Sequence, residues 1–330
     1  MVERAVLRDC GHAVTVRQTG GPATHFTGNQ IRRTASVAAV ADPLRIGIAS
    51  FGAREFQALH AVCQQKGHEP LVHVYCRSMR PRRPTDAFAT ETVGSLLEAI
   101  PAGVDLLVPG SSEGLAKALA GYDLDLLVVY GFSWKLPPSV LEVPRLGVLN
   151  IHCSLLPEYR GPAPVLWAIR NGDAHLGVTV HRMDEDFDTG PVLAQQDGIP
   201  IDDDVTPDTL WPRLEPVIRR LLVDSLDRAS QGYPGTPQDG ARATYAGLMG
   251  PEFSLVNRSQ TAREIHNQVR TFRFMGPDLG PTVEIDGRLL RVLRTRLTPT
   301  DGIRLECADN PIWITESAPV ESVRGLSAAG

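Results

Sequence analysis

The sequence predicts an α/β protein, in which a mostly parallel, doubly wound sheet is followed by a small β-rich, OB-like C-terminal domain. From residue 44 onward, short apolar runs alternate with amphipathic stretches of helical length, a pattern typical of βαβ units. Some runs, such as residues 126–129, are apolar at every position, as expected of strands covered on both faces. Asp-Gly pairs at 286–287 and 301–302 separate short apolar runs, which favours β-hairpins.

The first half of the sheet is predicted from a regular succession of strands and helices. The apolar run at 44–49 ends in Ser50-Phe51-Gly52 and precedes a helix over 56–63, which Gly67 ends. A basic, proline-rich loop at 77–84 interrupts the pattern. Further strands are expected at 71–75, 104–108, 124–129 and 147–151, and further helices at 91–100 and 113–120.

The same alternation continues in the middle of the chain. A helix over 164–171 is expected to end at Gly172. Two apolar runs at 177–182 and 192–196 then predict two more strands. We therefore expect the sheet to extend beyond residue 151.

A long helix is predicted over residues 206–230. Thr206 is its expected N-cap, and Pro207 occupies the first helical position, where its missing N–H costs little. Pro212 and Pro216 lie inside the same stretch. Because an internal proline removes a helical hydrogen bond, we expect a kink or a break there.

The chain is predicted to divide into three parts. Residues 1–43 lack the rhythm of the rest and form an extension to which we assign no role; residues 44–240 form the α/β domain. The stretch 231–250 is rich in Gly and Pro, as in linkers. Residues 241–330 form the small C-terminal domain, with a helix at 259–272 and strands at 282–285, 289–293 and 303–307.

The composition limits the class of protein. The chain has 330 residues, is 42% hydrophobic and carries a formal net charge of −5, which argues against wholesale binding to nucleic acid or membrane surfaces. The five cysteines are scattered without a C-x-x-C pair, so we expect neither a disulfide framework nor a metal site. No apolar run is long enough for a membrane helix, and no secretory signal is visible, so we expect a cytoplasmic protein.

The most informative segment lies at the end of the predicted strand 147–151. Asn150 and His152 are two residues apart, so both side chains project to the same face of the sheet. The carboxyl ends of parallel strands are where open α/β sheets bind their ligands. A loop stiffened by Pro157, Gly161 and Pro162 follows. The pair is either a candidate site or simply a polar pair that ends a strand.

An acidic loop between two later strands is the second informative segment. It reads Met183-Asp184-Glu185-Asp186-Phe187-Asp188-Thr189-Gly190. Taken alone, several carboxylates beside a glycine most often mean a solvated turn. The two segments together carry more information than either does alone.

Together, the two segments resemble the folate-dependent formyltransferase family, which includes methionyl-tRNA and sugar N-formyltransferases. The family hallmark reads N-x-H-x-S-L-L-P-x-[YW]-R-G, followed later by M-x-x-G-x-D-T-G. The first motif is matched at Asn150, His152, 154–157 and 159–161, and the second at Met183 and 188–190. Residues 129–131 with Leu136-Pro137 are similar to the family's Y-G-x-x-L-P turn, and residues 263–272 look like the start of its C-terminal domain.

Two residues depart from the family pattern. Asp186 stands where the family has Gly, and if that position needs a positive φ, the pterin-binding turn is altered. Cys153 stands where the family usually has Pro, Ala or Ser. We expect it to be a small buried thiol.

The resemblance implies an enzyme that moves the formyl group of N10-formyltetrahydrofolate onto an amine, without a metal. In this reading the amide of Asn150 stabilises the oxyanion and His152 is the general acid and base. Asp188 orients the imidazole and stabilises its cation, directly or through a water.

The resemblance also implies two groups of binding residues. The folate is expected along the strand ends, against Tyr130, Gly131, Phe132, Leu136, Asp184, Asp186 and Phe187. The acceptor is expected against the loop after Asn150, at Ser154, Leu155, Tyr159, Arg160 and Gly161.

Four interpretations of the activity remain open. A small-molecule amine, such as an amino sugar or a biosynthetic intermediate, is favoured as the acceptor, because the C-terminal domain looks short and lacks a Lys-rich tail. Initiator methionyl-tRNA is the alternative, which the basic loop with Arg77, Arg80, Arg82 and Arg83 supports. A formyltetrahydrofolate hydrolase and a non-catalytic folate-binding protein are the others. A dinucleotide dehydrogenase fits poorly, because Gly47 and Gly52 do not form G-x-G-x-x-G.

Overall fold

A computed structural model of the chain describes residues 42–75, 87–132 and 134–320. The basic loop with Arg77, Arg80, Arg82 and Arg83, and residues 1–41 of the expected extension, lie outside these ranges. The division of the chain at residues 43 and 240 stays a prediction. Within the described ranges, no helix combines the length and the apolar character needed to cross a membrane.

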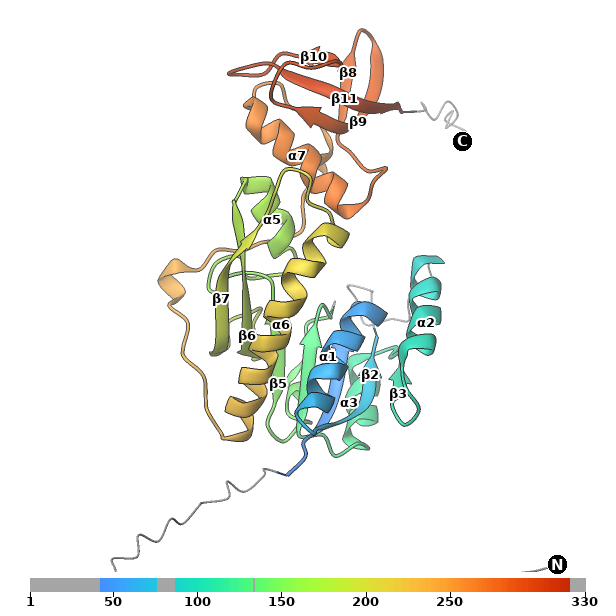
Figure 1. The fold of residues 1–330 in the computed structure, drawn as a ribbon, viewed down its shortest axis with the longest axis vertical. Coiled ribbons are helices and arrows are strands. Elements are labelled where there is room, and N and C mark those ends of the chain that lie inside the picture. The colour runs from blue at the N-terminus through green and yellow to red at the C-terminus, as the bar shows by residue number, and fades with distance from the viewer. Residues whose placement is uncertain (1–41, 76–86, 133, 321–330) are drawn as a thin grey trace, which may run out of the picture. The chain divides into compact units, whose positions relative to one another are not determined.

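The larger sheet has seven strands in the order β3-β2-β1-β4-β5-β6-β7 (Figure 1). The pairs from β3 to β5 are parallel, whereas β6 pairs antiparallel with β5, and β7 with β6. The mostly parallel sheet that the sequence predicts is thus confirmed. The strands are β1 (Arg45–Ser50), β2 (Glu69–Val74), β3 (Asp105–Leu107), β4 (Leu126–Tyr130), β5 (Val148–His152), β6 (His175–Arg182) and β7 (Val192–Pro200).

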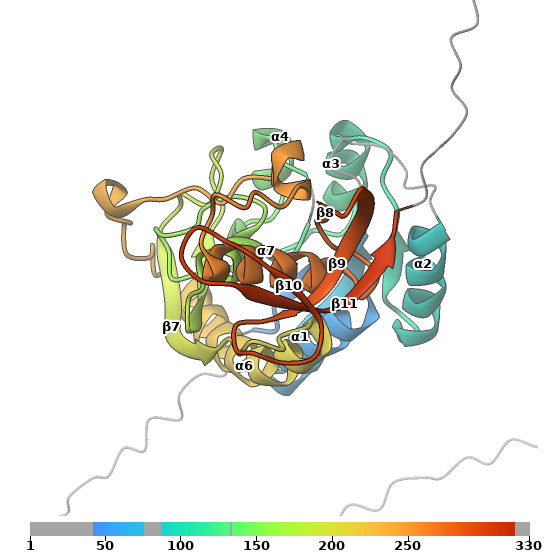
Figure 2. The ribbon, with the colours of Figure 1, turned by 90° about the horizontal axis from the view of Figure 1, so that it is seen from above.

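Helices cover both faces of this sheet, as Figure 2 shows. On one face, α1 (Ala53–Gln65) and α6 (Pro207–Ser230) pack against each other and against the strands. On the other face lie α3 (Ser112–Ala120) and α4 (Pro138–Leu141). Alternate residues of β4 enter the two cores: Leu126 and Val128 the first, Leu127 and Val129 the second. This double burial explains why the run 126–129 has no polar position.

Helix α6 runs unbroken through both of its internal prolines, so the predicted break is wrong. Thr206 caps its start, as predicted, with its side chain accepting the N–H of Thr209. Pro212 and Pro216 are exposed and one turn apart, so the carbonyl groups that lose a partner face water. The opposite side of the helix carries buried residues, including Leu214 and Ile218, and their packing keeps the helix continuous.

A smaller sheet of four antiparallel strands follows, in the order β10-β11-β9-β8. Helix α7 (Ala262–Met275) lies against it, and Thr261 and Glu264 form a capping box at the start of α7. The predicted hairpin at Asp286-Gly287 is present, with positive φ at both residues. The hairpin expected at Asp301-Gly302 is wrong, because β9 and β10 on either side of it both pair with β11 and not with each other. The strands are β8 (Thr282–Ile285), β9 (Arg288–Arg296), β10 (Ile303–Leu305) and β11 (Ile312–Pro319). Strand β11 was not expected from the sequence, because its second half is polar.

The direction of the strand order reverses at β1. From β1 the chain proceeds to β2 and β3 on one side and then returns to β4 and β5 on the other. The carboxyl ends of β1, β4 and β5 therefore meet at the switch point of the sheet, which is where ligands of such folds bind. Gly131 follows β4 with a φ of 80°, and the ring of Phe51 lies so close that a Cβ there would be 1.9 Å from it.

Gly177 in β6 lets the loop after β5 pack against the sheet. A Cβ on Gly177 would lie 2.7 Å from the backbone nitrogen of Leu155 and 2.8 Å from its Cβ. Because these are partly backbone atoms, they cannot move aside as the end of a flexible side chain could. The glycine thus fixes how closely the segment that follows His152 approaches β6.

We predict that Gly177→Ala destabilises the protein by about 1–3 kcal/mol, the usual cost of overpacking. The measurement is the free energy of unfolding in urea. The matched control is Gly94→Ala in α2 (Ala87–Ala99), where nothing lies within 4 Å of the added Cβ and helix propensity favours alanine. Equal effects of the two substitutions would contradict the close packing at Gly177.

Candidate active site

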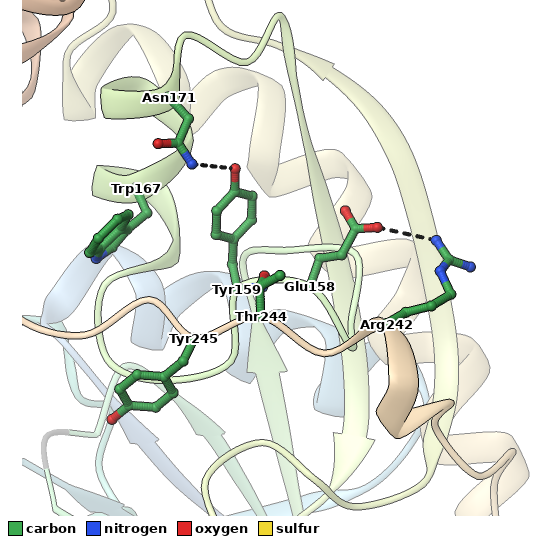
Figure 3. Close-up of a pocket in the computed structure, with 7 residues that line it drawn as sticks. All are labelled: Glu158, Tyr159, Trp167, Asn171, Arg242, Thr244 and Tyr245. Atoms are coloured by element: carbon green, nitrogen blue, oxygen red, sulfur yellow. Dashed lines mark hydrogen bonds and ion pairs between the residues drawn. The ribbon is translucent and has the colours of Figure 1, made fainter.

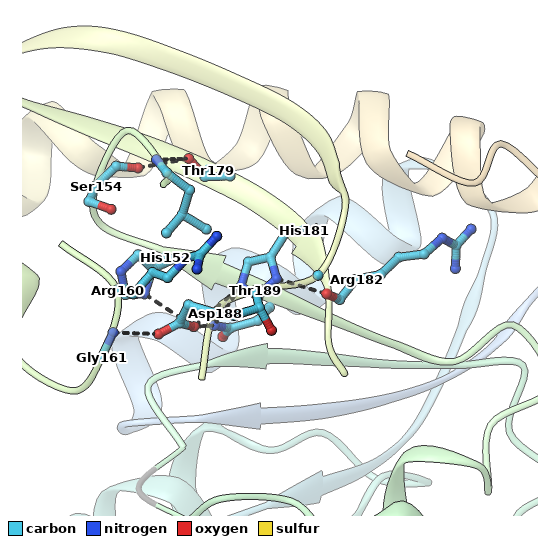
Figure 4. A network of polar contacts seen from close by, with 12 residues as sticks. His152, Ser154, Arg160, Gly161, Thr179, His181, Arg182, Asp188 and Thr189 are labelled. Atoms are coloured by element: carbon cyan, nitrogen blue, oxygen red, sulfur yellow. Dashed lines mark hydrogen bonds and ion pairs between the residues drawn. The ribbon is translucent and has the colours of Figure 1, made fainter. Parts of the chain in front are cut away.

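The structure brings the three candidate catalytic residues together at the end of β5, and Figure 4 shows two of them, His152 and Asp188. Asn150 and His152 come from β5, and Asp188 comes from the loop between β6 and β7. The Nδ2 of Asn150 donates to the Oδ1 of Asp188 at 3.1 Å. The Nδ1 of His152 lies 3.6 Å from the same oxygen. Two segments separated by the whole of β6 therefore form one polar cluster.

The imidazole of His152 is oriented by a backbone carbonyl. Its Nε2 lies 2.8 Å from the carbonyl oxygen of Tyr159, and since that oxygen can only accept, Nε2 carries the hydrogen. In the neutral ring the lone pair is therefore on Nδ1, which faces Asp188. Tyr159 has a φ of 55°, an uncommon conformation that turns its carbonyl toward the ring. Its hydroxyl is fixed by Asp173 at 2.8 Å and Asn171 at 2.9 Å.

Burial and charge set the protonation of the pair. Burial lowers the pKa of His152, and the charge of Asp188 and the contact with the Tyr159 carbonyl oppose this only in part. Burial alone would raise the pKa of Asp188, but its contact with His181, the charges of both histidines and the N–H of Gly161 lower it to about 2. The site thus combines a charged carboxylate with an imidazole that burial keeps neutral.

Most of the residues expected to contact the acceptor form hydrogen bonds that hold the loop after β5 in place. The Oγ of Ser154 donates to the carbonyl of Glu158 at 2.6 Å, and the guanidinium of Arg160 donates to the side chain of Gln238 at 2.7 Å. The N–H of Gly161 donates to the Oδ2 of Asp188 at 2.8 Å. Leu155 is half-buried. These contacts hold the loop, and whether its residues also touch an acceptor stays a prediction.

The Gly- and Pro-rich segment after α6 packs against this loop. Backbone hydrogen bonds join Arg160 to Thr244 and Ala246, at 2.9 and 2.6 Å. The side-chain nitrogen of Gln238 donates to the carbonyls of Asp188 and Gly190, at 2.8 and 2.7 Å. The segment that the sequence marks as a linker is therefore part of the frame of the site.

A hollow of about 300 Å³ lies beside the loop and shares Tyr159 with the His152 site (Figure 3). Three of its lining residues are aromatic, and Arg242 and Glu158 form an ion pair of 3.1 Å at its edge. The ring of Tyr245 is 59% exposed, so it offers a bare apolar face. The hollow is lined by Glu158, Tyr159, Trp167, Asn171, Arg242, Thr244 and Tyr245.

The two loops expected to hold the folate also meet. The Nζ of Lys135 lies 3.6 Å from the Oδ1 of Asp186 and 5.5 Å from the ring centre of Phe187. The loop after β4 thus contacts the loop before β7. The ring of Phe187 is 46% exposed, and that of Phe132 packs edge-on against Trp134.

Other candidate folate residues contribute through their backbone or through packing. The side chain of Tyr130 is buried, with its hydroxyl 3.5 Å from the Sγ of Cys153, and Leu136 is buried in the second core. Asp184 accepts the hydroxyl of Thr189 at 2.7 Å. Burial raises the pKa of the Cys153 thiol to about 11, so it is a buried thiol, as expected.

Asp186 does not disturb the loop in the way the sequence analysis considered. Among the described residues other than glycine, positive φ occurs at Asp123, Tyr159, Asp188 and Asp286. Asp186 is not one of them, so its place needs no glycine. The left-handed residue of this loop is Asp188, with a φ of 55°.

Sequence reasoning missed three residues of the site. His181 lies 3.3 Å from Asp188, Gln238 bonds the backbone around Asp188, and the hydroxyl of Thr179 donates to the carbonyl of Ser154 at 2.7 Å. The available signal was a histidine that follows the run Val178-Thr179-Val180 in a predicted strand. It could be used only by knowing that β6 pairs antiparallel with β5, which places His181 opposite Asn150.

The sequence profile of the family described as Formyl transferase matches residues 45–226, which include the whole candidate site up to Asp188. The chain belongs to the formyltransferase family. It is 34% identical to a methionyl-tRNA formyltransferase of Synechococcus sp. (strain JA-3-3Ab) over 251 residues, covering 74% of this chain and 76% of that protein. A relative of the same name from Pseudomonas paraeruginosa is 32% identical over 282 residues, covering 80% of this chain and 88% of the relative.

Solved structures share the fold at lower identity. A sugar N-formyltransferase from Shewanella sp. superimposes with a TM-score of 0.55 at 18% identity, covering 76% of this chain and 96% of that one. HypX from Aquifex aeolicus in complex with tetrahydrofolic acid gives a TM-score of 0.57 at 19% identity, covering 84% of this chain and 44% of that one. These matches confirm the family expected from the sequence, and with it the enzyme class and the folate co-substrate. The expected fold is also confirmed.

We predict that Asp188 makes the stability of the fold depend on pH in the acid range. Its pKa is lowered to about 2 in the folded protein, so the stabilisation is present above the ordinary carboxyl pKa and lost as the pH falls from about 4 to about 2. The free energy of unfolding of the wild type should fall by about 2 kcal/mol more than that of Asp188→Asn over this range. The exposed neighbour Glu185, changed to Gln, is the control and should follow the wild type. Parallel pH profiles for wild type and Asp188→Asn would contradict this prediction.

Proposed function

We propose that this formyltransferase carries the formyl group from N10-formyltetrahydrofolate to a primary amine, with Asn150, His152 and Asp188 as the catalytic residues. The observation that carries the proposal is the convergence of these side chains at the end of β5. Asn150 and His152 approach one carboxylate oxygen of Asp188, at 3.1 and 3.6 Å. A carboxamide donor, a neutral imidazole and a carboxylate are the groups that acyl transfer between two nitrogens requires.

Each residue has one role in the proposed reaction. The amine nitrogen attacks the formyl carbon, and the electron pair of the C=O bond moves to oxygen, where an N–H of Asn150 stabilises it. The Nδ1 of His152 takes the proton of the attacking amine and delivers it to N10 as the bond between the formyl carbon and N10 breaks. Asp188 stabilises the imidazolium between these steps. No covalent bond to the protein is needed, which agrees with the raised thiol pKa of Cys153.

The donor fits the loops after β4 and before β7. Phe51, which follows β1, and Phe187, in the loop before β7, are exposed, and the partly exposed Gly131 lies beside the ring of Phe51. A flat, hydrogen-bonding pterin suits backbone groups that lie beside exposed aromatic rings. The folate contacts proposed at residues 130–136 and 184–187 rest on this arrangement.

Methionyl-tRNA is the acceptor that the relatives described above support. Both are named methionyl-tRNA formyltransferase, and they are 32–34% identical to this chain over most of their length. A cluster of arginines agrees with it. Within the described part of the C-terminal domain, five arginines form ion pairs with three carboxylates, Asp203, Asp204 and Glu316, which leaves net positive charge. Such a surface suits phosphate groups. The arginines are Arg263, Arg270, Arg273, Arg294 and Arg296.

A small-molecule amine, which the sequence analysis favoured, is the second candidate. The hollow beside Tyr159 supports it, since about 300 Å³ is the lower end of the range for small-ligand sites. Trp167 and Tyr245 offer flat faces to a ring on such an acceptor. The hydrolase and the non-catalytic folate-binding protein become outcomes of the experiments below.

We predict that His152→Ala lowers kcat about 10²- to 10⁴-fold and Asn150→Ala about 10²- to 10³-fold, with smaller changes in KM. The measurement is the loss of the formyl group from N10-formyltetrahydrofolate in the presence of an acceptor. Glu113→Gln on the exposed side of α3 is the control and should retain full activity. Folate binding without turnover in the wild type would mean a binding protein, and unchanged kcat in both alanine variants would refute the assigned roles.

We predict that the acid limb of kcat/KM lies below pH 6.5, the ordinary value for histidine. The base must be neutral, and burial lowers the pKa of His152, so activity should persist below that pH. Because the charge of Asp188 raises the pKa of His152, Asp188→Asn should move the remaining limb to lower pH. A limb at or above pH 6.5 would argue against His152 as the base.

We predict that the acceptor can be identified by two pairs of variants. With methionyl-tRNA as acceptor, Arg294→Gln combined with Arg296→Gln should raise KM about tenfold at low salt, and the difference from the wild type should shrink as salt rises. With a small amine, the arginine variants should act like wild type, and Trp167→Ala or Tyr245→Ala should raise KM instead. The assay compares initiator methionyl-tRNA with a panel of small amines. Formate release without any amine would identify the hydrolase.

A further inference from the structure

Tyr159 is shared by the His152 site and the hollow beside it, and the proposed reaction gives it no task. Its carbonyl oxygen lies 2.8 Å from the Nε2 of His152, whereas its ring lines the hollow. Its backbone has a φ of 55°, which is uncommon for a bulky residue. Such a conformation persists only where the surrounding groups hold it.

Thr244, in the stretch after α6, holds the main chain of Tyr159. Its Oγ1 accepts the N–H of Tyr159 at 2.8 Å, and its carbonyl oxygen accepts the N–H of Arg160 at 2.9 Å. The N–H of Arg160 and the carbonyl of Tyr159 belong to the same planar peptide unit and point in opposite directions. Fixing the N–H therefore also fixes the direction of the carbonyl, toward His152.

The side chain of Tyr159 is held at its far end. Its hydroxyl donates to the Oδ2 of Asp173 at 2.8 Å and accepts from the Nδ2 of Asn171 at 2.9 Å, as Figure 3 shows for Asn171. Because Cα is tetrahedral, fixing both the N–H and the ring leaves one direction for the bond to the carbonyl carbon. A free ring would let φ return to negative values, which would turn the carbonyl away from His152.

Asp173 lies on a rigid support. It follows α5 (Pro164–Asn171), whose end is capped by Gly172 with a φ of 77°. The N–H of Asp173 donates to the carbonyl of Ala168 at 3.0 Å. The buried Asn267 of α7 packs against the turn, since a Cβ on Gly172 would lie 2.6 Å from its Nδ2. The turn is thus fixed from two sides and can hold the hydroxyl of Tyr159 in one place.

The carbonyl of Tyr159 competes with Asp188 for the hydrogen of the neutral imidazole. Nε2 lies 2.8 Å from the carbonyl oxygen, within hydrogen-bond distance, whereas Nδ1 lies 3.6 Å from the Oδ1 of Asp188. A neutral ring has one hydrogen to donate. A carboxylate is the stronger acceptor, so without the carbonyl the hydrogen would pass to Nδ1. Nδ1 could then no longer take a proton from the attacking amine.

We propose that Asp173 and Thr244 are positioning residues that hold Tyr159, so that its carbonyl keeps the hydrogen of neutral His152 on Nε2 and the lone pair on Nδ1. The inference rests on the proposed function, because it explains which ring nitrogen can serve as the base. Both residues act through Tyr159 and not on the reacting atoms.

Tyr159→Phe, Asp173→Ala and Thr244→Val each remove one of the holding contacts. We expect each variant to lower kcat about 5- to 30-fold, because the base is present but its lone pair is displaced in part of the molecules. KM for the folate should change little. Asp173→Asn keeps an oxygen that can accept the hydroxyl of Tyr159, so it should retain kcat within about threefold of the wild type.

Tyr122→Phe is the matched control. The hydroxyl of Tyr122 donates to Asp105 at 2.6 Å, so this variant also loses a tyrosine–aspartate hydrogen bond. Tyr122 precedes β4 and Asp105 begins β3, so the pair lies at the edge of the sheet opposite to the carboxyl ends of the parallel strands. The variant should keep the kcat and KM of the wild type.

Nitrogen NMR tests the position of the hydrogen without turnover. At a pH where the ring is neutral, the chemical shifts of the two nitrogens show which of them carries the hydrogen, and His152→Ala identifies the signals. In the wild type the hydrogen should be on Nε2. In Tyr159→Phe and Asp173→Ala a larger share of it should be on Nδ1.

Any of three results would overturn the proposal. They are a hydrogen that stays on Nε2 in Tyr159→Phe, equal losses of kcat in Tyr159→Phe and Tyr122→Phe, and a raised KM for the acceptor at unchanged kcat, which would make the hydroxyl an acceptor contact. A shifted hydrogen in the variants of a protein whose wild type transfers no formyl group would instead contradict the proposed function and leave the roles of Asp173 and Thr244 standing.

Discussion

The carboxylate of Asp188 joins the segments from which the site is built. Its Oδ2 accepts the N–H of Gly161 in the loop after β5, and its Oδ1 faces Asn150, His152 and His181 on β5 and β6. A carboxylate can accept from several sides at once and still carry a negative charge. Asp188 has an uncommon left-handed backbone conformation, with a φ of 55°, which turns its side chain toward the site. Gln238 donates to the carbonyl of Asp188 and holds the backbone in that conformation.

Much of the architecture could be predicted from the sequence, because it rests on burial. Strand β4 is apolar throughout since both faces are covered, and α6 begins where Thr206 can cap it. The break expected at Pro212 and Pro216 failed because both prolines face water, a property set by the packing of the opposite side. Strand β11 was missed because pairing with β9, and not an apolar pattern, makes it a strand.

The motif residues of the site could be identified in the sequence, whereas the residues that hold them could not. Asn150, His152 and Asp188 stand in recognisable patterns. The carbonyl of Tyr159 reaches His152 because of an uncommon backbone conformation, and His181 lies at the site because of the register between β5 and β6. Gln238 contacts the backbone of Asp188 across 50 residues of chain. A single sequence reveals none of these relations. Asp186 is the converse case: it departs from the family pattern, yet the loop accommodates it without a positive φ.

The stretch after α6 has a consequence for anyone who wishes to recombine these proteins. Its Gly- and Pro-rich composition suggests a domain boundary near residue 240, before the C-terminal sheet. Yet Thr244 and Ala246 hydrogen-bond to the loop that carries Arg160, and Gln238 bonds the backbone on both sides of Thr189. A chimera joined at residue 240 would exchange half of this support for a foreign sequence. A junction placed beyond residue 250 would instead move the C-terminal sheet and α7 as a unit and leave the loop with Arg160 bonded to its own Thr244 and Ala246.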